Sequence, residues 1–198
     1  MKIQGPPLGD AEVRQALRLW LFQKHTGEAD TVIVDELGVC QGKVRIDLAV
    51  VNGVLHGYEI KSNRDTLRRL EGQVDLYSKV LDRATIVVGD RHLSHTLTIV
   101  PVWWGILRFD QGPKGPQFKT VRRGRLNPQR DPRALVELLW LNDAMALLEE
   151  RRAARGVRGK PRYMVWDRVC EHVKLQDIAT AVRDKIKVRA ALQGSLQR

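Results

Sequence analysis

The N-terminal part of the chain has an apolar pattern that changes from helical to strand spacing. Leu17 and Leu21 belong to a set of apolar residues three and four positions apart, which is typical of an amphipathic helix. Three β-rich runs follow, separated by the hairpin signals Gln41-Gly42 and Asn52-Gly53. Four elements are therefore predicted: a helix over residues 11–24 and strands over residues 31–39, 44–51 and 55–61.

The following segment is predicted to complete an α/β unit that ends near Asp110. A helix is expected from Asn63 to Leu81, because the apolar residues of this segment fall on one helical face. The apolar run 84–89 is typical of a strand that is buried on both faces, and residues 102–109 predict a further strand.

The composition changes after residue 110. A turn or linker is indicated by Gly112, Pro113, Gly115 and Pro116. Further helices are predicted over residues 132–152, 165–173 and 175–192. We therefore expect an α/β domain over residues 1–110 and a basic, mainly helical region over residues 111–198.

Composition narrows the class of protein. With 198 residues, of which 43% are hydrophobic, the chain can form one or two domains with a core. Its apolar runs are shorter than the roughly 20 residues that cross a bilayer, so no membrane partner is expected. Met1 to Gly5 lack an apolar signal core, and Cys40 and Cys170 are far apart in the sequence. These features predict a cytoplasmic protein with reduced thiols.

The net charge of +11 is concentrated in the C-terminal part of the chain. Residues 1–113 hold 14 basic and 14 acidic residues, whereas residues 114–198 hold 20 basic and 9 acidic residues. Nucleic acid is the natural partner of such a surface, and a merely solubilising surface is the alternative. The candidate phosphate contacts in this region are Arg122, Arg123, Arg125, Arg155, Arg158 and Lys160.

The candidate chemistry lies on the second and third predicted strands. A loop one residue longer than Asn52-Gly53, with the glycine in the left-handed conformation, keeps the apolar residues of both strands on one face. A strict two-residue loop would separate them. We therefore predict that Asp47 lies opposite Glu59. A two-residue turn between the first two strands likewise places Glu36 beside Asp47.

Three neighbouring carboxylates repel one another unless a cation or a proton lies between them, and Mg²⁺ suits such oxygen ligands. Lys61 lies two residues after Glu59 on the same face, where it could orient a water or stabilise a phosphoryl transition state. Gln73 and Tyr77 share a helical face and reach this site if the helix packs over the strands. The alternative interpretation is the polar outer face of an antiparallel sheet, with Tyr77 in the core.

Together, these residues resemble the PD-(D/E)XK nuclease superfamily. The elements that match RecB-like and phage-exonuclease-like members are Asp47, then Glu59-Ile60-Lys61 after a hairpin, then Gln73 and Tyr77 on a helix. With Trp103-Trp104-Gly105-Ile106, the wider pattern is similar to a bacterial and phage group related to MmcB-type DNA repair proteins. The resemblance covers roughly residues 10–110 and departs at Ile46, where the motif that names the superfamily has proline.

The resemblance implies a restriction-endonuclease-like mixed sheet flanked by helices, and a Mg²⁺-dependent hydrolase for which Mn²⁺ can substitute. It implies that Asp47, Glu59 and the backbone carbonyl of Ile60 bind the metal ion. An additional acidic ligand would be either Glu36 or, on the first helix, Glu12.

The same resemblance assigns Lys61 to the attacking water, and Gln73 and Tyr77 to support of the site or contact with the DNA backbone. We expect a deoxyribonuclease in DNA repair, recombination or phage DNA processing. The alternatives are a DNA-binding module with little or no catalysis, and an interaction protein that binds RNA or an acidic partner. The sequence is also compatible with a homodimer. Candidate phosphate contacts on the helix after the third strand are Arg64, Arg68 and Arg69, for which a solvated face is the alternative.

Overall fold

A computed structural model describes residues 8–112 and 115–196 of the chain. Its strands are β1 (Val32–Val39), β2 (Val44–Val51), β3 (Leu55–Lys61), β4 (Arg83–Val88), β5 (Gly105–Gly112) and β6 (Gly115–Arg122). Its helices are α1 (Asp10–Lys24), α2 (Leu70–Val80), α3 (Asp90–Ile99), α4 (Pro132–Val136), α5 (Leu141–Glu150), α6 (Arg162–His172) and α7 (Leu175–Leu196). The prediction about export used Met1 to Gly5, and the predicted turn included Pro113. These residues lie outside the described part of the chain. None of the described helices is long and apolar enough to cross a membrane.

The strands form one six-stranded mixed sheet whose spatial order follows the chain order. β1, β2 and β3 are antiparallel neighbours, whereas β3, β4 and β5 are parallel. The helices α2 and α3 provide the two crossovers that parallel neighbours require. β6 returns antiparallel beside β5. The predicted α/β class, a mixed sheet flanked by helices with further helices at the C-terminus, is confirmed.

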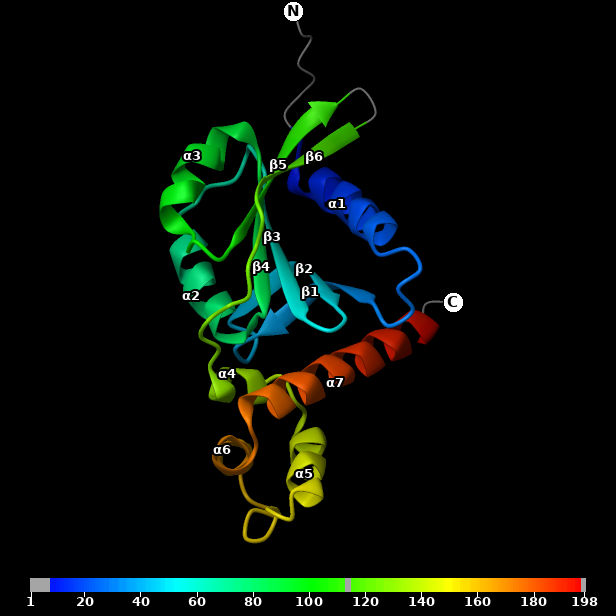
Figure 1. The fold of residues 1–198 in the computed structure, drawn as a ribbon, viewed down its shortest axis with the longest axis vertical. Coiled ribbons are helices and arrows are strands. Elements are labelled where there is room, and N and C mark those ends of the chain that lie inside the picture. The colour runs from blue at the N-terminus through cyan, green and yellow to red at the C-terminus, as the bar shows by residue number, and fades with distance from the viewer. Residues whose placement is uncertain (1–7, 113–114, 197–198) are drawn as a thin grey trace, which may run out of the picture.

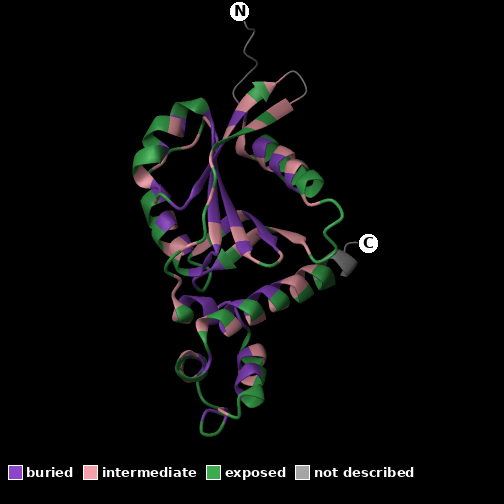
Figure 2. Cartoon of the chain, viewed as in Figure 1, coloured by how far each residue is buried: buried purple, intermediate pink, exposed green. Residues whose placement is uncertain are grey.

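Helix α1 covers one face of the sheet, and α2 and α3 cover the other (Figure 1). Leu17 and Leu21 of α1 are fully buried in one apolar cluster with Leu48 of β2. On the other face, Val74 of α2 belongs to a larger cluster that also contains Ile178 of α7. Burial is therefore concentrated along the central strands, between the helical layers (Figure 2).

The C-terminal helices pack onto the sheet through a buried charge as well as apolar residues. Asp82, which is 6% exposed, precedes β4 and accepts the backbone N–H of Leu55 at 2.7 Å. Its carboxylate also pairs with Arg130 and, at 3.3 Å, with Arg183 of α7. Loss of either arginine would leave a buried charge less well compensated. Helices α5 and α6 form the end of the molecule opposite the β5–β6 hairpin (Figure 1).

Two predicted helices differ from the structure. The helix expected from residue 63 begins only at Leu70, because the preceding residues form turns in which Asp65 accepts the backbone N–H of Ser62 at 2.6 Å. The helix expected over 132–152 is divided into α4 and α5. The sequence patterns did not predict α3 or β6, and β6 adds a strand to the region expected to be mainly helical.

Candidate active site

The structure confirms the predicted registers of both hairpins, but Gly53 does not adopt the left-handed conformation that was expected for it. Leu48 lies opposite Tyr58, which is the alignment that brings Asp47 level with Glu59. The alignment of β1 with β2 likewise brings Glu36 level with Asp47, although the connecting loop is longer than the expected two residues. The three acidic residues therefore lie at matching positions of three adjacent strands.

β2 and β3 separate where Asp47 and Glu59 lie. Their pairing ends at Leu48 and Tyr58, whereas β3 continues along β4 to its last residue. The carboxylate of Asp47 accepts a hydrogen bond from the backbone N–H of Ile60 at 2.7 Å. This bond replaces the β2 carbonyl that would accept from Ile60 if the two strands stayed paired. A cleft of about 760 Å³ opens here, and its lining includes residues of α1, β2, β3 and α2.

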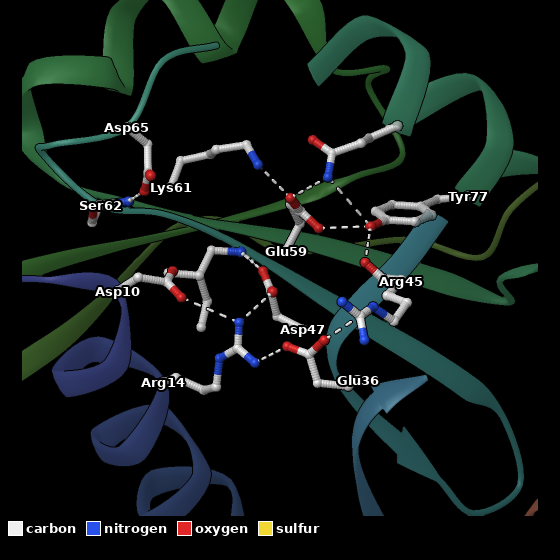
Figure 3. A network of polar contacts seen from close by, with 12 residues as sticks. Asp10, Arg14, Glu36, Arg45, Asp47, Glu59, Lys61, Ser62, Asp65 and Tyr77 are labelled. Atoms are coloured by element: carbon white, nitrogen blue, oxygen red, sulfur yellow. Dashed lines mark hydrogen bonds and ion pairs between the residues drawn. The ribbon is translucent and has the colours of Figure 1, made fainter. Parts of the chain in front are cut away.

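Glu59 lies among donors on the α2 side of the cleft (Figure 3). It is 3% exposed, and its Oε1 accepts hydrogen bonds from Lys61 and, at 2.6 Å, from Gln73. The Tyr77 hydroxyl lies 2.8 Å from Oε2 and 2.6 Å from the backbone carbonyl of Arg45. Burial, and then the charge of Glu59, raise the pKa of Tyr77, so the hydroxyl remains a donor. The structure thus brings together the residues that the hairpin and helix spacing predicted to meet.

Arg14 of α1 binds three carboxylates on the other side of the cleft (Figure 3). Its guanidinium lies 2.8 Å from Asp47 and 3.1 Å from Asp10, and it also pairs with Glu36. Arg45 lies 3.2 Å from Glu36 as well. Burial opposes the charge of Arg14, but the hydrogen bond to Glu36 and the neighbouring carboxylates outweigh it and raise the pKa of Arg14. Sequence reasoning missed Arg14, and its one local signal is the i,i+4 spacing from Asp10.

The carboxyl group of Asp47 has a strongly altered ionisation. Burial, and then the negative charge of Glu59, raise the pKa of Asp47 to about 7. The hydrogen bond from Ile60 and the charge of Arg14 act in the opposite direction but are weaker. The Asp47–Glu59 pair therefore favours a proton or a cation between its members at neutral pH.

The donor set of the cleft suits one Mg²⁺ ion. Asp47 and Glu59 offer two carboxylates, and Mg²⁺ commonly takes only one or two from a protein while it keeps several waters. The Oε1 atom of Gln73 is buried and has no hydrogen-bond partner among the described residues, so it can accept a hydrogen bond from a water in the cleft. Over residues 8–112 and 115–196, no three His, Cys, Asp or Glu side chains form a metal-binding group. The remaining ligands would be water molecules and a backbone carbonyl oxygen. The resemblance to the nuclease superfamily assigns that carbonyl to Ile60.

The other predicted site residues lie in several places. Glu12 caps its own helix, because its carboxylate accepts the backbone N–H of Gly9 at 2.8 Å. Arg68 and Arg69 line the cleft, and Arg122 and Arg123 line a separate pocket. Arg155 and Arg158 line a hollow in the loop that connects α5 to α6. Arg158 pairs with Glu149 at 2.9 Å. Arg64, Arg125 and Lys160 are exposed.

Fold and site together define an α/β protein with carboxylates and a buried lysine in a cleft where two strands separate. A family model described as bacteriophage P4 protein cII matches residues 8–194, so the chain belongs to that family. Protein cII of Enterobacteria phage P4 is 34% identical over 119 residues, which cover 60% of this chain and only 45% of that relative. Among solved structures, the SPO1766 protein of unknown function from Silicibacter pomeroyi is 20% identical, with a TM-score of 0.44 over 76% of this chain and 92% of that chain.

Proposed function

We propose that this chain is a Mg²⁺-dependent deoxyribonuclease of the PD-(D/E)XK type. It would act in the cytoplasm and hydrolyse phosphodiester bonds in DNA during repair, recombination or phage DNA processing. The observation that carries the proposal is that half-buried Asp47 and buried Glu59 lie together beside buried Lys61. Two carboxylates repel a polyanion, so a surface that only binds DNA has no use for them, whereas a metal-dependent hydrolase needs them.

Each side chain of the cleft has a defined part in this proposal. Asp47 and Glu59 would hold the ion, which supplies Lewis-acid activation of the phosphate and of the attacking water when bound. The buried ammonium of Lys61 would stabilise the negative charge that develops on the phosphoryl oxygens. Gln73 and Tyr77 donate to the two oxygens of Glu59 and so fix the orientation of its carboxylate. They act as positioning residues.

DNA would approach along the arginines at the mouth of the cleft. Arg68 and Arg69 line it and are exposed, and neither side chain has a hydrogen bond or ion pair within the described part of the chain. Their charges are therefore free to meet phosphates. Contacts of this kind give affinity that falls with salt and carries no sequence information.

A second candidate function is a DNA-binding module with this fold and little or no catalysis. Arg14 favours it, because its guanidinium already contacts Asp47, Asp10 and Glu36. In that case an internal arginine compensates the acidic cluster, and the cleft is a structural ion-pair network.

A cleavage assay separates the two functions. Wild-type protein is incubated with linear and circular, single- and double-stranded DNA, and with RNA, in Mg²⁺, in Mn²⁺ and in EDTA. We expect DNA cleavage only with a metal ion, and Glu59→Gln should lower the rate about 100-fold or more. Glu71→Gln is the matched control, because Glu71 is an exposed residue of α2 outside the cleft. If the wild type binds DNA but leaves every substrate intact, the nuclease proposal is wrong and the binding module stands.

A further inference from the structure

A second pocket lies on the face of the sheet that α1 covers, and it shares no lining residue with the acidic cleft. Its volume of about 470 Å³ is within the usual range of small-molecule sites. Side chains from β3, β4, β5 and β6 and from the last two turns of α1 line it. It is therefore a separate site rather than an extension of the cleft.

Among the residues that the structure describes, four cationic side chains and no carboxylate line the pocket. Lys24 lies over the ring of Trp20 at 4.9 Å, and Arg83 donates to the backbone carbonyl of Gly124 at 3.4 Å. Arg122 donates to two backbone carbonyls, both at 2.8 Å. Arg123 is exposed, and its side chain makes no hydrogen bond or ion pair with the residues that the structure describes. The positive charge of the pocket is therefore not neutralised by the lining residues.

A polar chain at the floor of the pocket has one donor more than it uses. The Nε2 atom of His56 lies 2.8 Å from the Thr85 hydroxyl, and its Nδ1 atom lies 3.3 Å from the Tyr58 hydroxyl. Burial, followed by the charges of Lys24 and Arg83, lowers the pKa of His56 to about 3, so the imidazole is neutral. The neutral imidazole and the two hydroxyl groups carry three polar hydrogens, but only two hydrogen bonds join them. In either tautomer, a hydroxyl hydrogen of Thr85 or Tyr58 is left for a ligand.

Aromatic rings complete the lining. Trp20 is half-buried at the pocket, and His56 stacks on Tyr58 with their ring centroids 4.3 Å apart. These rings offer planar apolar surfaces beside the cationic groups. A complementary ligand carries negative charge, presents hydrogen-bond acceptors and has a flat ring.

We infer that this pocket binds a nucleotide, with the phosphate near Arg83 and Arg123 and the base against Trp20. The nucleotide is either a free nucleoside phosphate or the terminal unit of a nucleic-acid strand, and both share this chemistry. The inference stands on the pocket alone and does not require that the acidic cleft be catalytic.

Calorimetric titration of the full chain in EDTA tests the inference, with adenosine 5′-monophosphate, adenosine and inorganic phosphate as probes. The nucleotide should bind more tightly than adenosine or phosphate. Arg123→Glu should weaken its binding about tenfold or more, since a charge-assisted contact is lost. Arg125→Glu is the matched control, because it makes the same charge change at an exposed residue that does not line the pocket. It should change the affinity less than about threefold.

Competition then identifies the source of the nucleotide. Displacement of the mononucleotide by a 5′-phosphorylated oligonucleotide assigns the pocket to a strand end, and failure to displace it assigns the pocket to a free nucleotide. Glu59→Gln should bind the mononucleotide like the wild type, which separates this site from the cleft. The inference is overturned if none of the probes binds, or if Arg125→Glu weakens nucleotide binding as much as Arg123→Glu.

Discussion

Replacement of Asp47 by asparagine should stabilise the protein more at pH 8 than at pH 4.5. The pKa of Asp47 is raised to about 7 in the folded protein, first by burial and then by the charge of Glu59. Between about pH 4 and pH 7 the folded state therefore binds more protons than the unfolded state, and the stability of the wild type falls as the pH rises through this window. Asparagine does not ionise, so the variant avoids this loss.

The size of the effect follows from the pKa values. The difference between the usual value of 3.8 and about 7 corresponds to about 4 kcal/mol of lost stability above pH 7, of which about 3 kcal/mol develops between pH 4.5 and pH 8. Asp47 also accepts hydrogen bonds from Arg14 and Ile60, and asparagine has only one acceptor oxygen. One donor is then left without an acceptor, at a cost of about 1–3 kcal/mol that varies little with pH. The pH-dependent part, about 3 kcal/mol, is the quantity to measure.

Urea unfolding followed by far-UV circular dichroism, in EDTA at both pH values, gives the free energies of unfolding. Asp35→Asn is the matched control, because Asp35 lies on β1 and forms an exposed ion pair with Arg18 at 2.5 Å. Such a pair contributes less than about 1 kcal/mol. If the effect of Asp47→Asn is the same at both pH values, the reasoning about the carboxylate pair is refuted.

Mg²⁺ should raise the unfolding temperature of the wild type at pH 8 but much less at pH 5, because protons compete for Asp47; scanning calorimetry should also show that Asp47→Asn removes the effect. Tyr77→Phe should lower the free energy of unfolding by about 1–2 kcal/mol in a urea titration, because buried Glu59 loses a donor. Arg68→Glu should weaken DNA binding, and reduce its salt dependence in filter-binding assays, more than Arg158→Glu, because Arg158 already pairs with a glutamate at 2.9 Å.

The positions of the acidic pair could be predicted because side chains alternate along a strand. Only one register of the second hairpin buries Leu48 and Tyr58 on the same face, and that register fixes Asp47 against Glu59. Ile46 was expected on this face as well but belongs to the other apolar cluster. β2 and β3 separate next to Ile46. A rule of alternating side chains assumes that the two strands stay paired, so it cannot predict that Ile46 packs on the other face.

Features that depend on the docking of distant elements were missed. Arg14 reaches Asp47 across 33 positions, so its role depends on how α1 lies on the sheet. β6 was missed because it is an edge strand that starts at Gly115-Pro116 and exposes most of its polar side chains. Its half-buried Phe118 pairs with Phe109, which alone is a weak strand signal.

The central claim is that the cleft hydrolyses phosphodiester bonds, and the rate of DNA cleavage by Lys61→Met tests it most directly. The Lys61 side chain is 8% exposed with its ammonium on Glu59, and methionine keeps the packing of the aliphatic stem while it removes the charge. Cleavage is measured in Mg²⁺ and DNA affinity in Ca²⁺. The account predicts a rate at least about 100-fold below that of the wild type, with DNA affinity nearly unchanged. A Lys61→Met protein that cleaves DNA as fast as the wild type would contradict it.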